Sequence, residues 1–175
     1  DLLHVDIKAL GKIAGVGHRI HGDRRRRARG IGWEHVHVAV DDHSRIAFVE
    51  VLADQEGPTC AAFLERAVAW FAARGITVQR VLSDNGSGYV SRVFRATCER
   101  LRIRHKRTRP YTPRTNGKAE RFIQTLLREW AYVVPYTTSA ERRRALRRYL
   151  AFYNRHRPHA SLSYEVPWSR LASAA

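Results

Sequence analysis

The order of strand-like and helix-like segments constrains the fold of this chain more than any other feature. Residues 2–7 alternate between apolar and polar side chains, which predicts a half-buried strand. Residues 35–40 and 46–52 predict two more strands. The rest of the chain predicts helices alternating with short strands, at residues 61–74, 78–82, 91–101, 103–106, 117–134 and 139–154. This order favours one α/β domain, residues 1–175, in which helices flank a mixed sheet.

Several residues mark where these elements begin and end. Pro58 suits a helix start and Gly75 a helix stop, while Ser91 and Ser139 are predicted N-caps. Residues 11–32 are rich in glycine and arginine and predict a loop or an extended hairpin. The tail from residue 155 onward is expected to be irregular.

The charge of the chain indicates its partner. Lysine and arginine number 32 against 16 acidic residues, which gives a net charge of +16. A domain this basic is typical of proteins that bind nucleic acid.

Other classes of protein are disfavoured by what the sequence lacks. Two cysteines, Cys60 and Cys98, are too few for a disulfide framework or a cysteine-based zinc site, and both are expected to be buried thiols. No apolar run of about 18 residues predicts a transmembrane helix, and no secretory signal is visible. The absence of methionine and the start at Asp1 suggest a domain taken from a longer chain.

Three carboxylates stand at the ends of predicted elements: Asp6 on the first strand, Asp84 just after the fourth, and Glu120 at the start of a long helix. Carboxylates converging from separate elements can hold two Mg²⁺ ions, which suits phosphoryl transfer. The spacing alone is weak evidence, because each acid also has a structural explanation. Asp6 could be an exposed strand residue, Asp84 a turn residue, and Glu120 a carboxylate favoured by the helix dipole.

The residues around these acids resemble one family. Residues 4–8, 83–89 and 110–121 are similar to the integrase catalytic core of bacterial insertion-sequence transposases, the DDE enzymes related to retroviral integrases. Residues 40–45 and 153–159 extend the resemblance, which covers residues 2–168 and includes the 35-residue gap between the second and third acids. The segment at residues 11–32 is longer and more basic than the family would lead us to expect.

The resemblance implies a fold and a reaction. The fold is ribonuclease-H-like, with a five-stranded mixed sheet and helices on both sides. Asp6, Asp84 and Glu120 would be the catalytic residues and would bind two Mg²⁺ or Mn²⁺ ions. Water would cleave a DNA strand at the transposon end, and the freed 3′-hydroxyl would then attack target DNA. The residues agree with this chemistry, because none of them needs to act as a nucleophile.

Basic and polar residues near the acids are candidates for DNA contact. Lys118 and Arg121 flank Glu120 and are predicted to contact phosphates, although they could also form a solvated helix face. The remaining candidates are Arg107, Arg109, Arg114, Asn116 and Asn85. The arginines lie on a proline-bounded stretch that could also be an ordinary surface loop, and the asparagines could simply be turn residues.

Two other functions remain possible at this stage. The chain could be another ribonuclease-H-like nuclease that acts on RNA–DNA hybrids or junctions, or a basic DNA-binding module without activity. Family members usually carry an N-terminal helix-turn-helix region, and this sequence is expected to begin after such a region would end. The resemblance also implies paired DNA ends, a homodimer or larger assembly on DNA, and a bacterial cytoplasmic, nucleoid-associated protein with no membrane partner.

Overall fold

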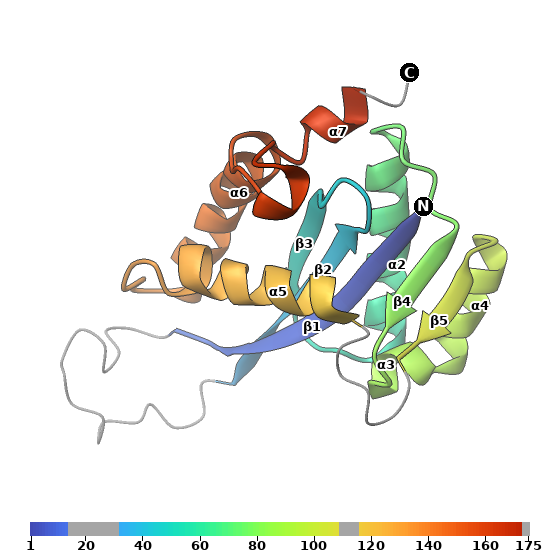
Figure 1. The fold of residues 1–175 in the computed structure, drawn as a ribbon. Helices are drawn as coiled ribbons and strands as arrows, with labels where there is room; N and C mark the ends of the chain where they lie inside the picture. The colour runs from blue at the N-terminus through green and yellow to red at the C-terminus, as the bar shows by residue number, and fades with distance from the viewer. Residues whose placement is uncertain (14–31, 109–115, 173–175) are drawn as a thin grey trace.

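A five-stranded mixed sheet runs through the middle of the computed structural model, which describes residues 1–13, 32–108 and 116–172 (Figure 1). The strands are β1 (Leu2–Gly11), β2 (Trp33–Asp41), β3 (Ala47–Leu52), β4 (Arg80–Ser83) and β5 (Arg104–Arg107). Their spatial order is β3-β2-β1-β4-β5, so the first strand is central. β1 pairs antiparallel with β2 and parallel with β4. The predicted fold class, a mixed sheet flanked by helices, is confirmed.

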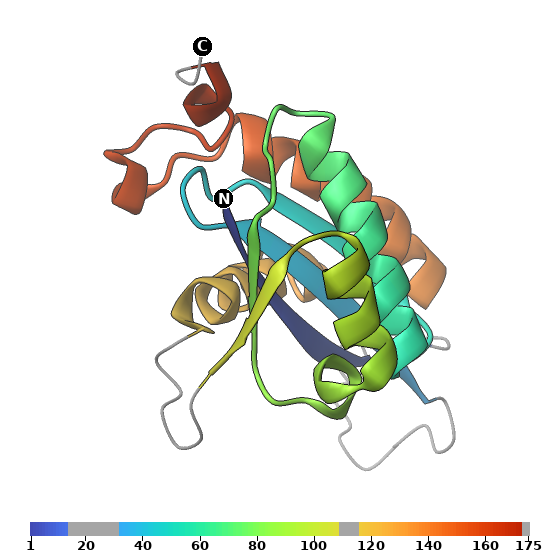
Figure 2. The same ribbon diagram turned by 90° about the vertical axis from the view of Figure 1, so that its right-hand side faces the viewer.

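One face of the sheet is covered by α2 (Gly57–Ala72), α3 (Ser87–Val90) and α4 (Arg92–Arg100) (Figure 2). Leu3 and Val5 of β1 point to this face and belong to a buried apolar cluster shared with α2 and α4. The alternation in the first strand therefore sends its apolar side chains to one face and leaves the other face to His4 and Asp6, since successive side chains of a strand alternate.

The opposite face is covered by α5 (Gly117–Leu126) and α6 (Ser139–Arg155) (Figure 1). α5 packs across β1 and β2, and its buried side shares a second apolar cluster with β2, β3 and α6. Trp130 is almost completely buried in this cluster. The second layer therefore holds the start of α5 close to the central strand.

The predicted helix starts are partly confirmed. Ser91 caps α4, and its hydroxyl accepts a 3.2 Å hydrogen bond from the backbone of Phe94. The cap of α6 is Thr138 and not Ser139, because the Thr138 hydroxyl accepts a 3.1 Å bond from the Glu141 amide. The Ser139 hydroxyl instead accepts a bond from the backbone after β1.

Several predicted bounds differ from the structure. β1 runs to Gly11, four residues beyond the strand predicted over residues 2–7. The helix predicted over residues 117–134 continues beyond α5 only as a π-helical turn at Leu127–Ala131. The tail is not wholly irregular, because it contains a 3₁₀ turn at Ala160–Leu162 and a short helix α7 (Ser169–Ala172). Residues 14–31 of the predicted glycine-rich loop lie outside the described residues.

The open end of the β1–β2 ladder is closed by a backbone hydrogen bond and by a buried ion pair. The Lys12 amide donates to the Gly32 carbonyl at 3.0 Å. The Arg142 guanidinium of α6 donates to the Gly11 carbonyl at 2.9 Å and to the Glu34 carboxylate at 2.7 Å. The side chains of Arg142 and Glu34 are only 2% and 5% exposed. We call this set of contacts the ladder clamp.

The two cysteines are buried, unpaired thiols, as expected. Burial raises the pKa of Cys60 to about 12 and the pKa of Cys98 to about 11, so neither is poised to react. Within the described part of the chain, no helix combines the length and hydrophobicity that crossing a membrane requires.

Candidate active site

The register of the sheet brings Asp6 and Asp84 to the same place. In the parallel pair of β1 and β4, His4 lies opposite Leu82. Two residues further along each chain come Asp6 and Asp84, so continuing this register sets one aspartate beside the other. Asp84 immediately follows the last residue of β4, where the chain turns away from the sheet.

Glu120 completes the set from the other layer. It lies in the first turn of α5, the helix that packs across β1 and β2. Its charge and the charge of Asp84 both act on the Asp6 carboxyl, so both acids lie within electrostatic range of Asp6. Asp84 and Glu120 are exposed, whereas Asp6 is partly buried.

The environment of Asp6 disfavours its ionised form. Burial raises the pKa of Asp6 to about 6, a backbone hydrogen bond from Ile7 opposes that rise, and the negative charges of Asp84 and Glu120 add to it. The Ile7 amide donates to Asp6 Oδ1 at 2.7 Å. A cation beside Asp6 would relieve this strain, because it would compensate the repulsion among the three carboxylates.

The three acids fit a hard divalent cation by their chemistry. Carboxylate oxygens are the ligands that Mg²⁺ and Mn²⁺ prefer. Asp84 Oδ1 accepts a 2.9 Å bond from the Gly86 amide, which fixes the carboxylate and leaves its other oxygen open. In the described residues, no three or more His, Cys, Asp or Glu side chains are gathered closely enough to hold a metal ion. The acids are therefore brought to one region without forming a closed coordination site.

A buried hydrogen-bond network fixes the start of α5. His4 Nδ1 lies 3.1 Å from Asn116 Oδ1, and His4 Nε2 lies 2.7 Å from Asp42 Oδ1. The Asn116 amide group donates to the Val5 carbonyl at 3.0 Å. Since Asn116 directly precedes α5, these bonds tie the Glu120 helix to the strand that carries Asp6.

Asp42 connects this network to the surface. Partial burial would raise the pKa of Asp42, but hydrogen bonds from Lys118 and His4 outweigh that effect and hold the pKa below its usual range. The Lys118 ammonium forms an ion pair with the Asp42 carboxylate and also contacts its backbone carbonyl at 3.3 Å. Neither His4 nor Asp42 was among the predicted site residues, although both lie in segments that carry the family resemblance.

The predicted DNA contacts occupy different environments. Arg121 is exposed on α5, and Lys118 is partly exposed beside Asp42. Asn85 is exposed, and its side chain donates to the Thr108 carbonyl at 2.9 Å. Arg107 is the last residue of β5 and not a loop residue. Arg109 and Arg114 lie outside the described residues.

Asn116 is the exception among these candidates. Its side chain is only 2% exposed, and both ends of its amide are used by His4 and Val5. This side chain therefore positions α5, while a DNA contact through the backbone donors at the start of α5 stays a prediction.

Comparison with known protein families decides the class of the chain. A family model described as "Integrase core domain" matches residues 2–113, and a second model of the same description matches residues 101–167. The chain belongs to the integrase core domain family. This assignment confirms the resemblance to transposase and integrase cores.

Two curated proteins are similar to part of this chain. The "Transposase InsD for insertion element IS2A/D/F/H/I/K" of Escherichia coli is 31% identical over 94 residues, which is 54% of this chain and 31% of that protein. The "Uncharacterized protein K02A2.6" of Caenorhabditis elegans is 32% identical over 130 residues, which is 74% of this chain and 10% of that protein. This integrase core thus spans less than half the length of these relatives.

Solved structures share the fold. A chain of the simian T-cell lymphotropic virus intasome, in complex with PP2A regulatory subunit B56 gamma, matches 97% of this chain and 53% of its own length with a TM-score of 0.73 and 21% identity. The catalytic core domain of BIV integrase matches 99% of this chain and 94% of its own length with a TM-score of 0.63 and 18% identity. The fold is therefore ribonuclease-H-like, as the resemblance implied.

The raised pKa of Asp6 predicts a pH-dependent stability in the absence of divalent metal. Its folded pKa of about 6 lies above the unfolded value of about 3.9, so stability is lost as pH rises from 4 through 6. Asp6→Asn removes this penalty and should raise the free energy of unfolding at pH 8 by on the order of 2 kcal/mol, with no gain at pH 4.

Urea unfolding at the two pH values, in the presence of a chelator, measures the difference. Glu99→Gln, an exposed acid on α4, is the matched control and should show no pH-dependent gain. An Asp6→Asn variant that is less stable than the parent chain at pH 8 would show that the Asp6 carboxylate is not strained.

Proposed function

We propose that this chain is the catalytic core of a DDE transposase, which cleaves DNA at transposon ends and transfers the 3′-hydroxyl into target DNA. The observation that carries the proposal is the electrostatic coupling of Asp6 to Asp84 and Glu120, three acids contributed by separate elements. The family assignment and the basic charge of the chain support it. One relative is named a transposase, and one structural neighbour belongs to an intasome.

The reaction requires divalent metal in this proposal. Asp6, Asp84 and Glu120 would hold Mg²⁺ or Mn²⁺, two ions in the active complex. When bound, these ions stabilise negative charge on the attacking and leaving oxygens of an in-line phosphoryl displacement. Burial of Asp6, and to a lesser extent repulsion by Asp84 and Glu120, disfavours its carboxylate, and a bound cation would offset both effects.

The other residues of the site position Glu120 or bind the DNA strand. The His4–Asn116 contact and the Asn116 bond to Val5 hold the first turn of α5, and so Glu120, against the central strand. Arg121, one residue further along α5, is exposed and suited to a phosphate of the bound strand. Lys118 would have one of two roles. It would leave Asp42 and bind a phosphate, or it would stay paired with Asp42 and hold the Asp42 carboxylate beside His4.

The substrate and assembly follow from the same proposal. DNA is the partner, and the chain, as one domain, binds it mainly through phosphates, since its exposed cations are mostly arginines. A transposase joins paired ends, so a homodimer or larger assembly on DNA is expected.

A strand-transfer assay tests the function. The chain is incubated with supercoiled plasmid and a labelled DNA duplex in Mg²⁺, in Mn²⁺ or in a chelator. Metal-dependent plasmid nicking and joining of the label to plasmid are the expected results. Cleavage restricted to a labelled RNA–DNA hybrid would favour the other ribonuclease-H-like nucleases. DNA binding without cleavage of either substrate would leave the non-catalytic DNA-binding module.

A further inference from the structure

A groove with a volume of ≈ 610 Å³ lies between α5 and the C-terminal tail, next to the proposed active site. Residues 117–128 form one wall and residues 157–164 form the other, and we call this hollow the tail groove. Its polar and aromatic lining includes Arg45, Lys118, Arg121, Arg128, His159 and Tyr164. Its volume falls within the range of roughly 300–1,000 Å³ that is typical of ligand pockets.

The charged residues that line the tail groove are all basic. No acidic residue lines it, whereas five basic residues do. Arg157 is neutralised by Glu129 at 2.7 Å, and Lys118 by Asp42. Arg121 has no ion pair or hydrogen bond with any other described residue, and Arg128 contacts only Glu129, at 3.9 Å, with its side chain 73% exposed. These two arginines lie seven residues apart on α5 and the turn that follows it, so they line one side of the helix and favour an anionic strand.

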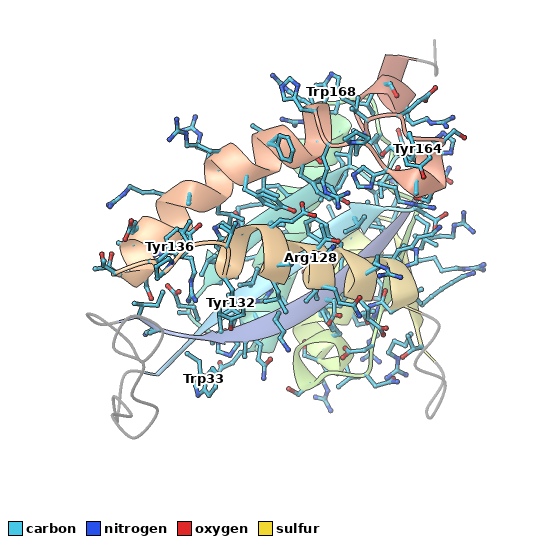
Figure 3. All side chains as sticks on the ribbon, turned by 60° about the vertical axis from the view of Figure 1, so that its left-hand side comes forward. Trp33, Arg128, Tyr132, Tyr136, Tyr164 and Trp168 are labelled. Carbon is cyan, nitrogen blue, oxygen red and sulfur yellow. The ribbon has the colours of Figure 1, made fainter. Side chains whose placement is uncertain are left out.

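The groove is also aromatic. Its floor contains Phe122 and Tyr153, whose rings meet edge-to-face at 4.8 Å. Tyr164 stands on the tail wall and is 77% exposed, opposite the helix that carries Arg128 (Figure 3). An exposed aromatic ring beside a cationic groove is the combination that single-stranded nucleic-acid sites use for base stacking.

The backbone holds Tyr164 in a disfavoured conformation. Tyr164 has φ = 64° and the preceding Ser163 has φ = 56°. Arg45, on the same groove, also has φ = 64°. Two of the four non-glycine residues with positive φ in the described chain, Arg45 and Tyr164, therefore line this groove. Strain of this kind collects at ligand sites, where function keeps it.

An unused polar group adds to the wall. His159 Nε2 is buried and has no hydrogen-bond partner among the described residues, while the ring packs at 4.8 Å against Tyr153. Burial, with the Arg157 charge beside it, lowers the pKa of His159 to about 4, so the ring is neutral at pH 7. The His159 ring therefore adds a neutral, packed surface to the groove wall and no further charge.

We propose that the tail groove binds an unpaired nucleotide of the DNA substrate, with phosphates at Arg121 and Arg128 and a base stacked on Tyr164. A duplex would engage the arginines but would leave the Tyr164 ring exposed, because paired bases are already stacked. This inference rests on the proposed function, since it takes DNA to be the substrate. It assigns the tail, residues 157–164, to substrate binding.

Fluorescence anisotropy with labelled DNA tests the proposal without relying on activity. The probes are a blunt duplex and the same duplex with a short single-stranded overhang. The chain should bind the overhang probe about 10-fold more tightly, as expected from one stacked base. Tyr164→Ala should abolish this preference, and Tyr164→Phe, which keeps the ring, should retain it.

Variants that remove a charge from the groove, or the disfavoured backbone conformation of Tyr164, test the proposal further. Arg128→Gln should weaken binding of both probes and lower the salt dependence, whereas Arg144→Gln, an exposed arginine on α6, should leave the overhang preference unchanged. Tyr164→Gly should raise the melting temperature by about 1–3 °C while weakening overhang binding, because glycine tolerates φ = 64°. A purely structural Tyr164 would show the reverse: lower stability and unchanged binding.

Contrary outcomes separate this inference from the proposed function. The groove assignment is overturned if the parent chain binds both probes with equal affinity, or if the overhang preference survives Tyr164→Ala. The transposase proposal still stands in that case if the chain cleaves plasmid in a metal-dependent way. Tighter binding of an RNA overhang than of the DNA overhang overturns the assignment to DNA. Failure to bind or cleave any DNA overturns both.

Discussion

Glu120→Gln is expected to reduce metal-dependent DNA cleavage and joining by at least roughly 100-fold, because removing one charged group at the reacting phosphate has an effect of this size or larger. Glutamine keeps the shape of the side chain but cannot supply a carboxylate for a cation. DNA affinity should change little, since phosphate binding depends on cations and Glu120 can only repel phosphate. Plasmid nicking in Mg²⁺ and anisotropy with the same DNA measure the two effects separately.

Because Glu120 is exposed, the effects of Glu120→Gln on cleavage and on DNA affinity can be compared without a loss of folding. An exposed carboxylate in the first turn of a helix contributes little to stability, so the variant should fold as the parent chain does. Glu99→Gln on α4 removes an equally exposed carboxylate outside the site and should leave cleavage unchanged. Equal loss of cleavage and of DNA affinity in Glu120→Gln would argue against a metal-binding role for this residue.

Arg142→Ala is expected to lower the free energy of unfolding by about 3–5 kcal/mol, the usual effect of removing one partner of a buried ion pair. The change leaves the buried Glu34 carboxylate with only the longer contact to Arg143, at 3.6 Å, in place of its 2.7 Å partner, and it leaves the Gly11 carbonyl without its 2.9 Å donor. Denaturant unfolding at pH 7 measures the loss.

Two further variants isolate the cause. Arg144→Ala removes an exposed arginine from the same helix and should change stability by no more than about 0.5 kcal/mol. The double variant Arg142→Met with Glu34→Leu should recover part of the loss, because no unpaired charge remains buried. If Arg142→Ala were no more destabilising than Arg144→Ala, the ladder clamp would not be a source of stability.

The sheet and the longer helices could be predicted from local pattern, because most of these elements carry apolar side chains at the spacing of a strand or a helix. The end of α5 could not. Trp130 continues the helical spacing of apolar residues, but it lies in the π-helical turn Leu127–Ala131, where the number of residues per turn changes, and Pro135 prevents a helix from continuing much further. The α6 cap had a usable signal, since Thr138 and Glu141 stand in the spacing of a capping box and Ser139 does not.

The three acids could be recognised because their neighbours in sequence carry the family pattern. Arg142 could not be singled out from the arginines around it. Its burial depends on Glu34, 108 residues away, and nothing in the local spacing distinguishes it. The tail groove was invisible for a similar reason, because it exists only where residues 157–164 pack beside α5. Long-range contacts of this kind decide which polar residues leave the surface.

The ladder clamp separates the sheet from the chain that connects its first two strands. Lys12 and Gly32 meet at 3.0 Å, and Arg142 joins Gly11 to Glu34, so the register of β1 and β2 is set before the connection begins. The number of residues between these anchors then has little influence on the sheet, since doubling the length of a connection costs only about 0.6 kcal/mol. A sequence of different length, a peptide tag or a small folded module could replace this connection while β1 keeps Asp6 in the same position.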